Sequence, residues 1–402
     1  MTQAQHSGTR RRAASDALAL MMVLVAASVL TPPAQAQTFT VLHAFTGSPD
    51  GASPEAALLR DKAGDLYGTT FYGGDITCNQ GCGTIFKIDT RGKETVLYRF
   101  RGSPDGQYPL AQLFMDAAGN LYGTTYEGGA DNWGTVFKLD RKGKETLLHS
   151  FAGSPDAGQP EAGLIRDAAG NFYGTTNYGG ESGYGTVFKM DASGNVTVLY
   201  SFTGGADGSE PRAALIRDAA GNLYGTTFLG GGQYPYGVVF KLDTKGKETV
   251  LYTFTGGTDG GNPTADLVGD AAGNLYGTTD YGGSGQGENG FGVIFELNKS
   301  GDEQSLYQFT GGADGADPIA GLVRDPAGNL YGTDTEGGAY GYGTLFELHK
   351  SGKLTLPHSF CKLCDGAEPI GDLIRDAVGN LYGTTAQGGP SGYGTVFKIT
   401  PR

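Results

Sequence analysis

Short runs of β-branched and aromatic residues alternate with clusters of Gly, Asp, Asn and Pro along almost the whole chain. Apolar runs of about four to eight residues between turn formers are typical of β-strands. Four such runs follow one another at residues 162–166, 172–176, 185–190 and 196–202. The pattern therefore predicts a unit of four short strands joined by tight turns and one Gly-rich loop.

This unit is repeated. A Tyr-Gly-Thr motif recurs at intervals of 51 to 55 residues. Its tyrosines are Tyr67, Tyr122, Tyr173, Tyr224, Tyr276, Tyr331 and Tyr382. A period near 50 residues with four strands per repeat is typical of propeller blades. The sequence predicts an all-β fold with seven blades.

The two ends of the repeat array predict how the ring closes. Residues 38–45 resemble a lone fourth strand, and the chain stops after a third-type strand at residues 394–400. We expect these strands to pair and complete the last blade, which covers the edges that an open array exposes. Residues 37–402 then form one seven-bladed β-propeller of four-stranded blades. An open β-solenoid is the alternative.

Each unit reads Leu-Tyr-Gly-Thr-Thr, a Gly-Gly loop, Gly-Thr-Val-Phe-Lys and Leu-Tyr-x-Phe. With this pattern the chain resembles the Gloeobacter/Verrucomicrobia (GloVer) tandem-repeat family of choice-of-anchor type exported bacterial proteins. The resemblance covers nearly all of residues 37–402 and implies no established activity. Asp334, in place of the second Thr, and the four cysteines depart from the pattern.

The first 36 residues differ from the repeats. Three arginines precede a 14-residue apolar run, residues 17–30, and the sequence Ala-Gln-Ala ends the segment. This pattern predicts a secretory signal peptide, hence a secreted or periplasmic protein with no transmembrane segment after cleavage. Cleavage removes three Arg and one Asp, which moves the formal charge from -13 to -15. Such an acidic surface disfavours nucleic acid as a partner.

Cysteines occur only as two close pairs, Cys78 with Cys82 and Cys361 with Cys364. In an exported protein two disulfides are favoured over a four-Cys zinc site. Local pairs and a cross-pair that staples the ring both fit the spacing.

Repeated polar residues are explained by turns and packing. His43, His149 and His358 share one strand position with tyrosines of other units, which favours a packing role. Two sets of seven aspartates recur in turns on opposite faces, where carboxylates accept backbone hydrogen bonds. A cation ring is the alternative for the first set, although one carboxylate per blade is sparse for Ca²⁺. No cofactor and no metal site are predicted. The sets are Asp50, Asp105, Asp156, Asp207, Asp259, Asp314 and Asp365, and Asp61, Asp116, Asp167, Asp218, Asp270, Asp325 and Asp376.

A ligand without sevenfold symmetry needs positions that differ between blades. Such positions follow the proline of each inner strand, and the charged ones are Glu55, Glu161, Arg212, Asp266 and Asp372. Aromatic residues before the third strand also vary, and they include Trp133, Tyr184 and Tyr236. We expect the charged group at one end of the central channel and the aromatic group on the rim of the same face, where the rings suit sugars or proteins.

Two functions fit these residues. The favoured one is a non-catalytic recognition or scaffold module that binds glycan or protein through its loop face, because no motif of a known catalytic site occurs. The alternative is a polysaccharide hydrolase or lyase that uses the channel-mouth carboxylates. A glycosidase needs two carboxyl groups about 5 to 9.5 Å apart. The oligomeric state is not predicted.

Overall fold

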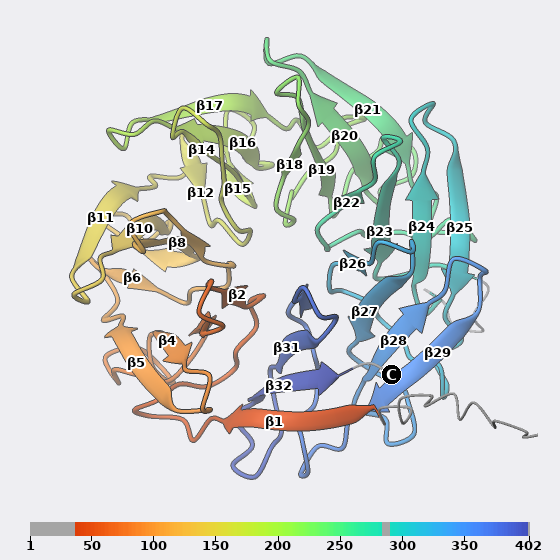
Figure 1. Cartoon of the computed structure of the whole chain (residues 1–402). Coiled ribbons are helices and arrows are strands. Elements are labelled where there is room, and N and C mark those ends of the chain that lie inside the picture. The colour runs from red at the N-terminus through yellow and green to blue at the C-terminus, as the bar shows by residue number, and fades with distance from the viewer. Residues whose placement is uncertain (1–36, 284–289, 401–402) are drawn as a thin grey trace, which may run out of the picture. The chain divides into compact units, whose positions relative to one another are not determined.

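The computed structural model describes residues 37–283 and 290–400, and its regular structure there consists of β-strands alone. Seven four-stranded antiparallel sheets stand around a central axis as the blades of a propeller (Figure 1). The predicted all-β, seven-bladed fold is therefore confirmed. No helix long and apolar enough to cross a membrane occurs in the described part of the chain. The predicted signal peptide lies outside the described residues and stays a prediction.

In blades one to six the chain passes from the innermost strand to the outermost, and in blade seven the N-terminal strand supplies the outermost position. The first strands are β2 (Leu59–Arg60), β7 (Phe114–Met115), β13 (Ile165–Arg166), β18 (Ile216–Arg217), β22 (Val268–Gly269), β26 (Val323–Arg324) and β30 (Ile374–Arg375). The second strands are β3 (Leu66–Thr70), β8 (Leu121–Thr125), β14 (Phe172–Thr176), β19 (Leu223–Thr227), β23 (Leu275–Thr279), β27 (Leu330–Asp334) and β31 (Leu381–Thr385).

The outer half of each blade holds longer strands. The third strands are β4 (Thr84–Ile88), β10 (Thr135–Leu139), β16 (Thr186–Met190), β20 (Val238–Leu242), β24 (Val293–Leu297), β28 (Thr344–Leu348) and β32 (Thr395–Thr400). The fourth strands are β5 (Glu94–Arg99), β11 (Glu145–Ser150), β17 (Val196–Ser201), β21 (Glu248–Thr253), β25 (Glu303–Gln308), β29 (Leu354–Ser359) and, in blade seven, β1 (Thr38–Ala44). Two small ladders join β6 (Gly106–Gln107) to β9 (Glu127–Gly128) and β12 (Ala157–Gly158) to β15 (Tyr178–Gly179).

The ring closes as predicted, since β1 pairs antiparallel with β32 from Thr38 opposite Thr400 to Ala44 opposite Thr395. A buried side-chain bond also crosses the joint, where the Thr384 hydroxyl donates to the Ala56 carbonyl at 3.3 Å. The N-terminal strand thus covers the edge of β32 and completes the last blade as a four-stranded sheet like the other six.

The innermost strands are shorter than predicted. Residues 162–166 were expected to form a strand, but only Ile165 and Arg166 pair with the second strand. The backbone before these two residues turns to the preceding blade instead, because the Ala162 carbonyl accepts from the Thr124 hydroxyl of blade two at 3.4 Å. Equivalent bonds link Thr175 to Ala213, Thr278 to Ala320 and Thr333 to Pro369. The first Thr of the repeat is therefore an inter-blade donor.

The core lies between neighbouring blades and consists of stacked phenylalanines. Phe100, after the fourth strand of blade one, packs edge-on against Phe137 of blade two with ring centroids 5.2 Å apart. Both rings are fully buried. A Cβ at Gly123 would lie 2.7 Å from the Phe137 ring, so the glycine of Tyr-Gly-Thr makes room for this stack. The repeat motif is thus a packing motif.

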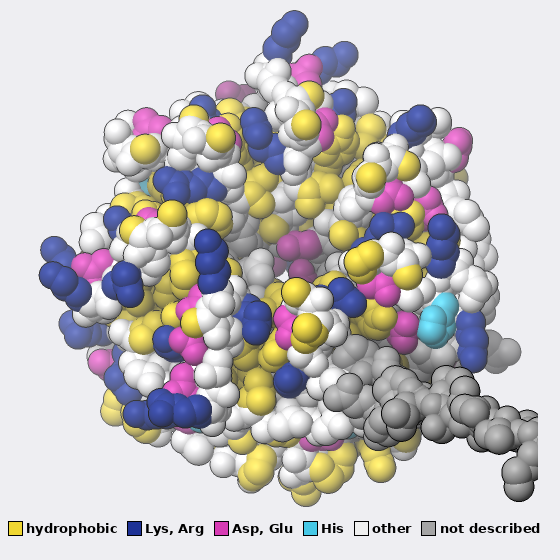
Figure 2. Space-filling view, viewed as in Figure 1, with side chains coloured by type: hydrophobic (Ala, Val, Ile, Leu, Met, Phe, Trp, Pro, Cys, Tyr) yellow, Lys and Arg dark blue, Asp and Glu magenta, His cyan; other side chains and the backbone are white. Residues whose placement is uncertain are grey.

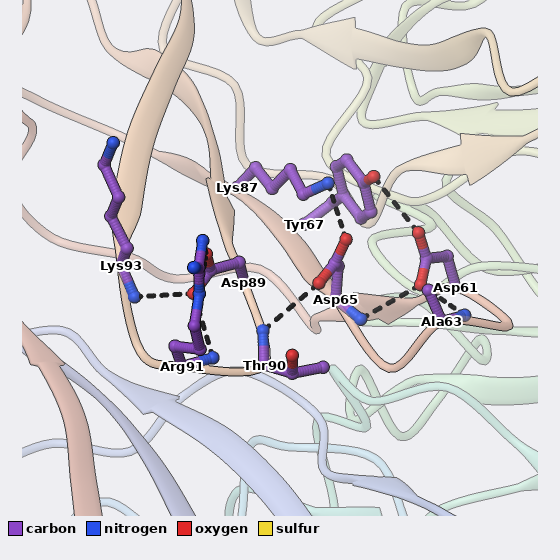
Figure 3. Close-up of polar contacts among 9 residues, drawn as sticks. All are labelled: Asp61, Ala63, Asp65, Tyr67, Lys87, Asp89, Thr90, Arg91 and Lys93. Atoms are coloured by element: carbon purple, nitrogen blue, oxygen red, sulfur yellow. Dashed lines mark hydrogen bonds and ion pairs between the residues drawn. The ribbon is translucent and has the colours of Figure 1, made fainter.

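The turns between first and second strands confirm the interpretation of the second aspartate set. Asp61 accepts bonds from the backbone N–H groups of Ala63 and Asp65, both at 2.9 Å, and from the Tyr67 hydroxyl at 3.2 Å (Figure 3). Lys87 lies 2.6 Å from the Asp65 carboxylate. Hydrogen bonds from N–H groups hold the pKa of the equivalent Asp167 at about 2, against the opposing effect of burial. These carboxylates stabilise the hairpins.

Both cysteine pairs form local disulfides, Cys78 with Cys82 and Cys361 with Cys364. The structure therefore contains neither a four-Cys zinc site nor a disulfide that joins the two cysteine loops. Each bond closes a loop of only a few residues on one face of the ring. The ring is closed by strand pairing instead of by sulfur.

Candidate ligand-binding face

The two faces of the ring are built from different segments. We call the loop face the side that carries the loops between second and third strands and the connections between blades. The hairpin face carries the two tight hairpins of each blade. Figure 2 shows the ring from its hairpin face, with acidic side chains at the bottom of a central hollow and Lys and Arg side chains around it.

The first aspartate set accepts hydrogen bonds within the turns that connect neighbouring blades on the loop face. Asp207 accepts from the backbone N–H of Thr203 at 2.8 Å and from the Tyr200 hydroxyl at 3.0 Å. The same pair recurs as Tyr98 with Asp105, Tyr252 with Asp259 and Tyr307 with Asp314. These aspartates are turn residues, and no group of three or more His, Cys, Asp or Glu side chains within the described ranges is arranged to hold a metal ion.

The histidines do more than pack. The Nε2 atom of His358 lies 2.8 Å from the Asp365 carboxylate, and His43 and His149 lie 3.4 and 3.6 Å from Asp50 and Asp156. Each histidine thus takes the place of a tyrosine hydroxyl beside the repeated aspartate. The sequence-based interpretation named packing alone because the aspartate partner is seven residues away across a turn.

One residue per blade at the channel mouth has a strained backbone. Its φ lies between 52° and 59°, in the left-handed region that favours glycine, yet none of the seven is glycine. Glu210 shows how the strain is held: its N–H donates to Tyr184 of the preceding blade, and its carbonyl accepts from Phe228, both at 3.0 Å. Such strain costs about 1 kcal/mol or more per residue and is concentrated at functional sites. The seven are Ser53, Tyr108, Gln159, Glu210, Asn262, Asp317 and Glu368.

A cavity of about 120 Å³ lies in the channel among the inner segments of the seven blades. All five charged residues singled out from the sequence line it, namely Glu55, Glu161, Arg212, Asp266 and Asp372. Their side chains come from blades one, three, four, five and seven. The expectation that they gather at the channel is therefore met, whereas their role in binding stays a prediction.

Arg212 is held among the acidic groups of blades three and four. Its Nη2 lies 2.9 Å from Glu210, and its Nε lies 3.9 Å from Glu161. The guanidinium also stands over the Phe228 ring at 3.8 Å. Glu161 in turn accepts from the Asn177 amide at 2.8 Å. Burial raises the pKa of Glu161, although Arg212 and Asn177 oppose the rise.

Glu55, in contrast to Glu161, has no polar partner. It makes no hydrogen bond or ion pair with another described residue, and it is largely buried in the wall of the cavity. Burial, followed by repulsion from Glu368 and Glu161, raises the pKa of Glu55 to about 7. Near neutral pH this carboxyl group is close to its own midpoint, so a nearby charge alters its protonation strongly.

Asp266 and Asp372 both line the cavity and lie close enough for their charges to repel. Each also accepts a 2.5 Å bond from a backbone N–H of another blade, Asp266 from Ala214 and Asp372 from Gly321. Burial, followed by repulsion from Asp266, raises the pKa of Asp372 to about 8. The pair therefore holds a proton at neutral pH and forms a polar floor of the cavity.

The rest of the mouth is divided into an acidic and an aromatic sector. In blades five and six, burial and repulsion between Asp280 and Asp317 raise the pKa of Asp280 to about 7. In blades one and two the Phe71 ring stacks on Tyr108 at 4.8 Å and meets Tyr72 edge-on at 4.5 Å. The sequence comparison missed Phe71 and Asp280, although each directly follows the second Thr of the repeat, a position that differs between blades.

The three aromatic residues predicted for the rim lie outside the channel cavity. A Cβ at Gly204 or Gly256, in the connection to the next blade, would meet the ring of Tyr184 or Tyr236 within 3 Å. The outer sides of these rings are free, since Tyr184 and Tyr236 are 48% and 38% exposed. Trp133 packs in the same way against Gly153 and is half-buried, so it belongs mostly to the blade interface.

The disulfides also lie where the rim of the loop face meets the connection to the next blade. A Cβ at Gly102 would lie 3.2 Å from the Cys78 sulfur, where other blades place a ring against glycine. In the connection to blade seven Lys362 replaces the glycine, and its ammonium stands over the Tyr342 ring at 5.6 Å. Both cysteine loops are local replacements in the aromatic rim.

Exposed aromatic side chains gather on the loop face. Apart from Leu147 and Val378, every large hydrophobic side chain exposed in the described ranges lies in a segment of this face. The tyrosines among them are Tyr178, Tyr184, Tyr234, Tyr236, Tyr340, Tyr342 and Tyr393. Rings with an apolar face and a polar hydroxyl suit contacts with sugars or proteins.

Comparison with known proteins agrees with the repeat pattern. The Gloeobacter/Verrucomicrobia repeat matches residues 28–232 and 218–402. No curated protein matches the chain.

Solved structures share the fold at low identity. The extracellular domains of a putative one-component and a putative hybrid two-component system from B. thetaiotaomicron are 11% and 12% identical, with TM-scores of 0.57 and 0.58. The alignments cover 89% and 90% of this chain and 39% of each of those chains, so this chain spans about two fifths of their length. A putative 6-phosphogluconolactonase from Bacteroides uniformis is 20% identical over 76% of this chain and 84% of its own, with a TM-score of 0.48. These similarities are to the fold alone.

Proposed function

Because the chain belongs to the Gloeobacter/Verrucomicrobia repeat family and its blades carry different side chains along the channel cavity, we propose that it is an exported recognition module that binds glycan or protein through its loop face. One observation carries the proposal. Seven strained residues, none of them glycine, each stand two positions before a residue that lines the channel cavity, and their side chains range from Ser and Tyr to Gln and Glu. A purely structural ring has no need for this variety.

Export is part of the proposal. Two disulfides are typical of proteins that fold in an oxidising compartment, and one structural neighbour is described as an extracellular domain. The predicted signal peptide of residues 1–36 agrees with a secreted or periplasmic location.

The cavity and the deep carboxyl pair favour recognition over polysaccharide cleavage. A volume of about 120 Å³ is small beside the roughly 300 Å³ or more of most small-molecule sites. Asp266 and Asp372 each accept a 2.5 Å bond from a backbone N–H of another blade, which ties both carboxyl groups to the propeller instead of leaving them free to act on a glycosidic bond. The loop face therefore suits a surface ligand from which one small group enters the channel.

The test is a thermal-unfolding screen of the purified protein against polysaccharides, with analysis of products for every hit. A ligand at 100 times its dissociation constant adds about 2.7 kcal/mol to the stability, which raises the melting temperature of a protein of this size by a few degrees or less. We expect Tyr184→Ala to weaken binding and Lys142→Ala, on the hairpin face, to leave it unchanged.

Cleavage of the ligand would show that the protein is a hydrolase or lyase and not a recognition module. Equal effects of both variants would show that the ligand does not bind to the loop face.

A further inference from the structure

We propose that the channel mouth binds a protonated primary amine of an amino-sugar ligand, between Glu55 and Glu368 beside the aromatic sector of blades one and two. The inference rests on the proposed recognition function and names the ligand class. Two sectors of the mouth contain similar groups, one around Arg212 and one around Glu55.

The first sector already contains a cation. Arg212 stands over the Phe228 ring at 3.8 Å, with Glu210 at 2.9 Å and Glu161 at 3.9 Å. A positive charge at this level of the channel is thus bound by two carboxylates and one aromatic face. Coulombic attraction and the ring quadrupole act together there.

The second sector offers the same kinds of group. Glu55 and Glu368 lie close enough for their charges to repel, and Tyr72 lies within the field of Glu55. Tyr72 belongs to the aromatic cluster with Phe71 and Tyr108. No cation of the described residues forms an ion pair with Glu55 or Glu368.

Glu55 is the residue that points to a ligand. Its side chain is partly exposed to the cavity that it lines, and its carboxyl group makes no hydrogen bond within the described structure. A carboxylate that is only partly solvated in a narrow channel and has no partner is less stable than one in open water, and a bound cation offsets that cost. Glu368 has one partner, the Gln387 amide at 2.7 Å, which holds its carboxylate in place.

The size of the cavity selects among cations. About 120 Å³ accommodates a compact ammonium group, which has three donors for Glu55, Glu368 and a further acceptor. A divalent metal ion is disfavoured, because no group of three or more acidic, His or Cys side chains in the described ranges is arranged around one point.

The rim of the mouth indicates what carries the amine. Exposed Tyr184, Tyr236 and Tyr393 present ring faces outside the cavity, and such faces suit the apolar sides of sugar rings. A polymer of glucosamine brings both features, since it has a ring for the rim and an ammonium group for the channel. A lysine-containing peptide shares only the ammonium group.

Calorimetric titration of the purified protein with the tetramers of glucosamine and of N-acetylglucosamine at pH 6 tests the inference. We expect the glucosamine tetramer to bind at least about tenfold more tightly, and added salt to weaken only that binding. Glu55→Gln keeps the shape of the side chain and should reduce the affinity for glucosamine tetramer about tenfold. Glu181→Gln, an exposed residue of the loop face, should have no effect.

Other outcomes overturn the inference. Equal affinity for both tetramers, binding of neither, or unchanged binding by a folded Glu55→Gln variant removes the amine from the mouth. Tighter binding of tetralysine assigns the site to a peptide, and calcium chloride that competes through Glu55 assigns it to a metal ion. Recognition of a neutral glycan that depends on Tyr184 would leave the proposed function standing while this inference fails.

Discussion

The hairpin face and the channel mouth use the same side chain, a carboxylate, in opposite surroundings. On the hairpin face Asp376 accepts from the backbone N–H groups of Val378 and Asn380, from the Asn380 amide and from the Tyr382 hydroxyl, all at 2.7 to 3.1 Å. These bonds lower its pKa in spite of burial. At the mouth Glu55 has none, and its pKa is raised to about 7. Carboxylates with several donors, like Asp376, stabilise the fold. Carboxylates without donors, like Glu55, lower its stability when they are charged.

Removal of a hairpin carboxylate should have the largest effect. Asp376→Ala leaves several donors without an acceptor, one of them a tyrosine hydroxyl, and should cost about 3 kcal/mol of unfolding free energy. Asp376→Asn keeps an acceptor oxygen and should cost less. Chemical denaturation at pH 7 measures both free energies of unfolding. A loss below about 1 kcal/mol for the alanine variant would contradict the claim that hairpin carboxylates stabilise the fold.

The deep pair should respond in the opposite direction. Asp372→Asn removes one of two like charges and lets the amide donate to Asp266, while its oxygen still accepts from Gly321. We expect this variant to gain about 1 to 2 kcal/mol at pH 8 or above, where the pair of carboxyl groups starts to lose its proton. The gain should vanish at pH 5, and a destabilised variant at both pH values would contradict the arrangement.

Asp334 offers the same test within the repeat itself. It occupies the place of the second Thr, is fully buried, and accepts from the Thr344 hydroxyl at 2.5 Å while its Oδ1 has no partner. In other blades the threonine donates to a carbonyl two residues on, as Thr385 does to Gln387. Asp334→Thr should therefore raise stability by about 1 kcal/mol. Thr385→Asp is the matched reverse change, and gains in both variants would exclude this reasoning.

The dependence of stability on pH combines carboxylates with lowered pKa values in the hairpins and carboxylates with raised pKa values at the start of fourth strands, and it should be the most gradual effect. Burial, with repulsion from a nearby aspartate, raises the pKa values of Glu94, Glu145, Glu248 and Glu303 to about 7. Raised values contribute stability that is complete below the unfolded pKa, near 4.5, and is lost as the pH rises through 7. Lowered values, such as about 2 for Asp167, contribute stability that is lost as the pH falls below about 4. The melting temperature should thus be highest near pH 4 to 5, and a maximum at pH 8 would contradict these shifts.

The framework could be predicted from the sequence because each of its elements is repeated. The Tyr-Gly-Thr spacing gave the number of blades, and the lone strands at both ends gave the closure. The short inner strands could not be predicted, since the hydroxyl of Thr124 reaches Ala162 across a blade interface and sequence alone does not give that distance.

The mouth was predicted only in part. Variation between units identified the five charged residues of the cavity, but it did not reveal which carboxylates have partners. Arg212 with Glu210 is a contact of neighbouring positions, whereas Glu368 approaches Glu55 only because the ring closes. The strained residues were missed because left-handed φ at non-glycine positions has no simple sequence signal.

The most direct test of the contrast between the two carboxylate classes is the unfolding free energy of Glu55→Gln relative to the wild type at pH 8, without ligand. The account predicts that this variant is at least as stable as the wild type and gains about 1 kcal/mol, because a buried charge without a partner is removed. A loss of stability comparable to that of Asp376→Ala would show that Glu55 supports the fold like a hairpin carboxylate, and would contradict the account.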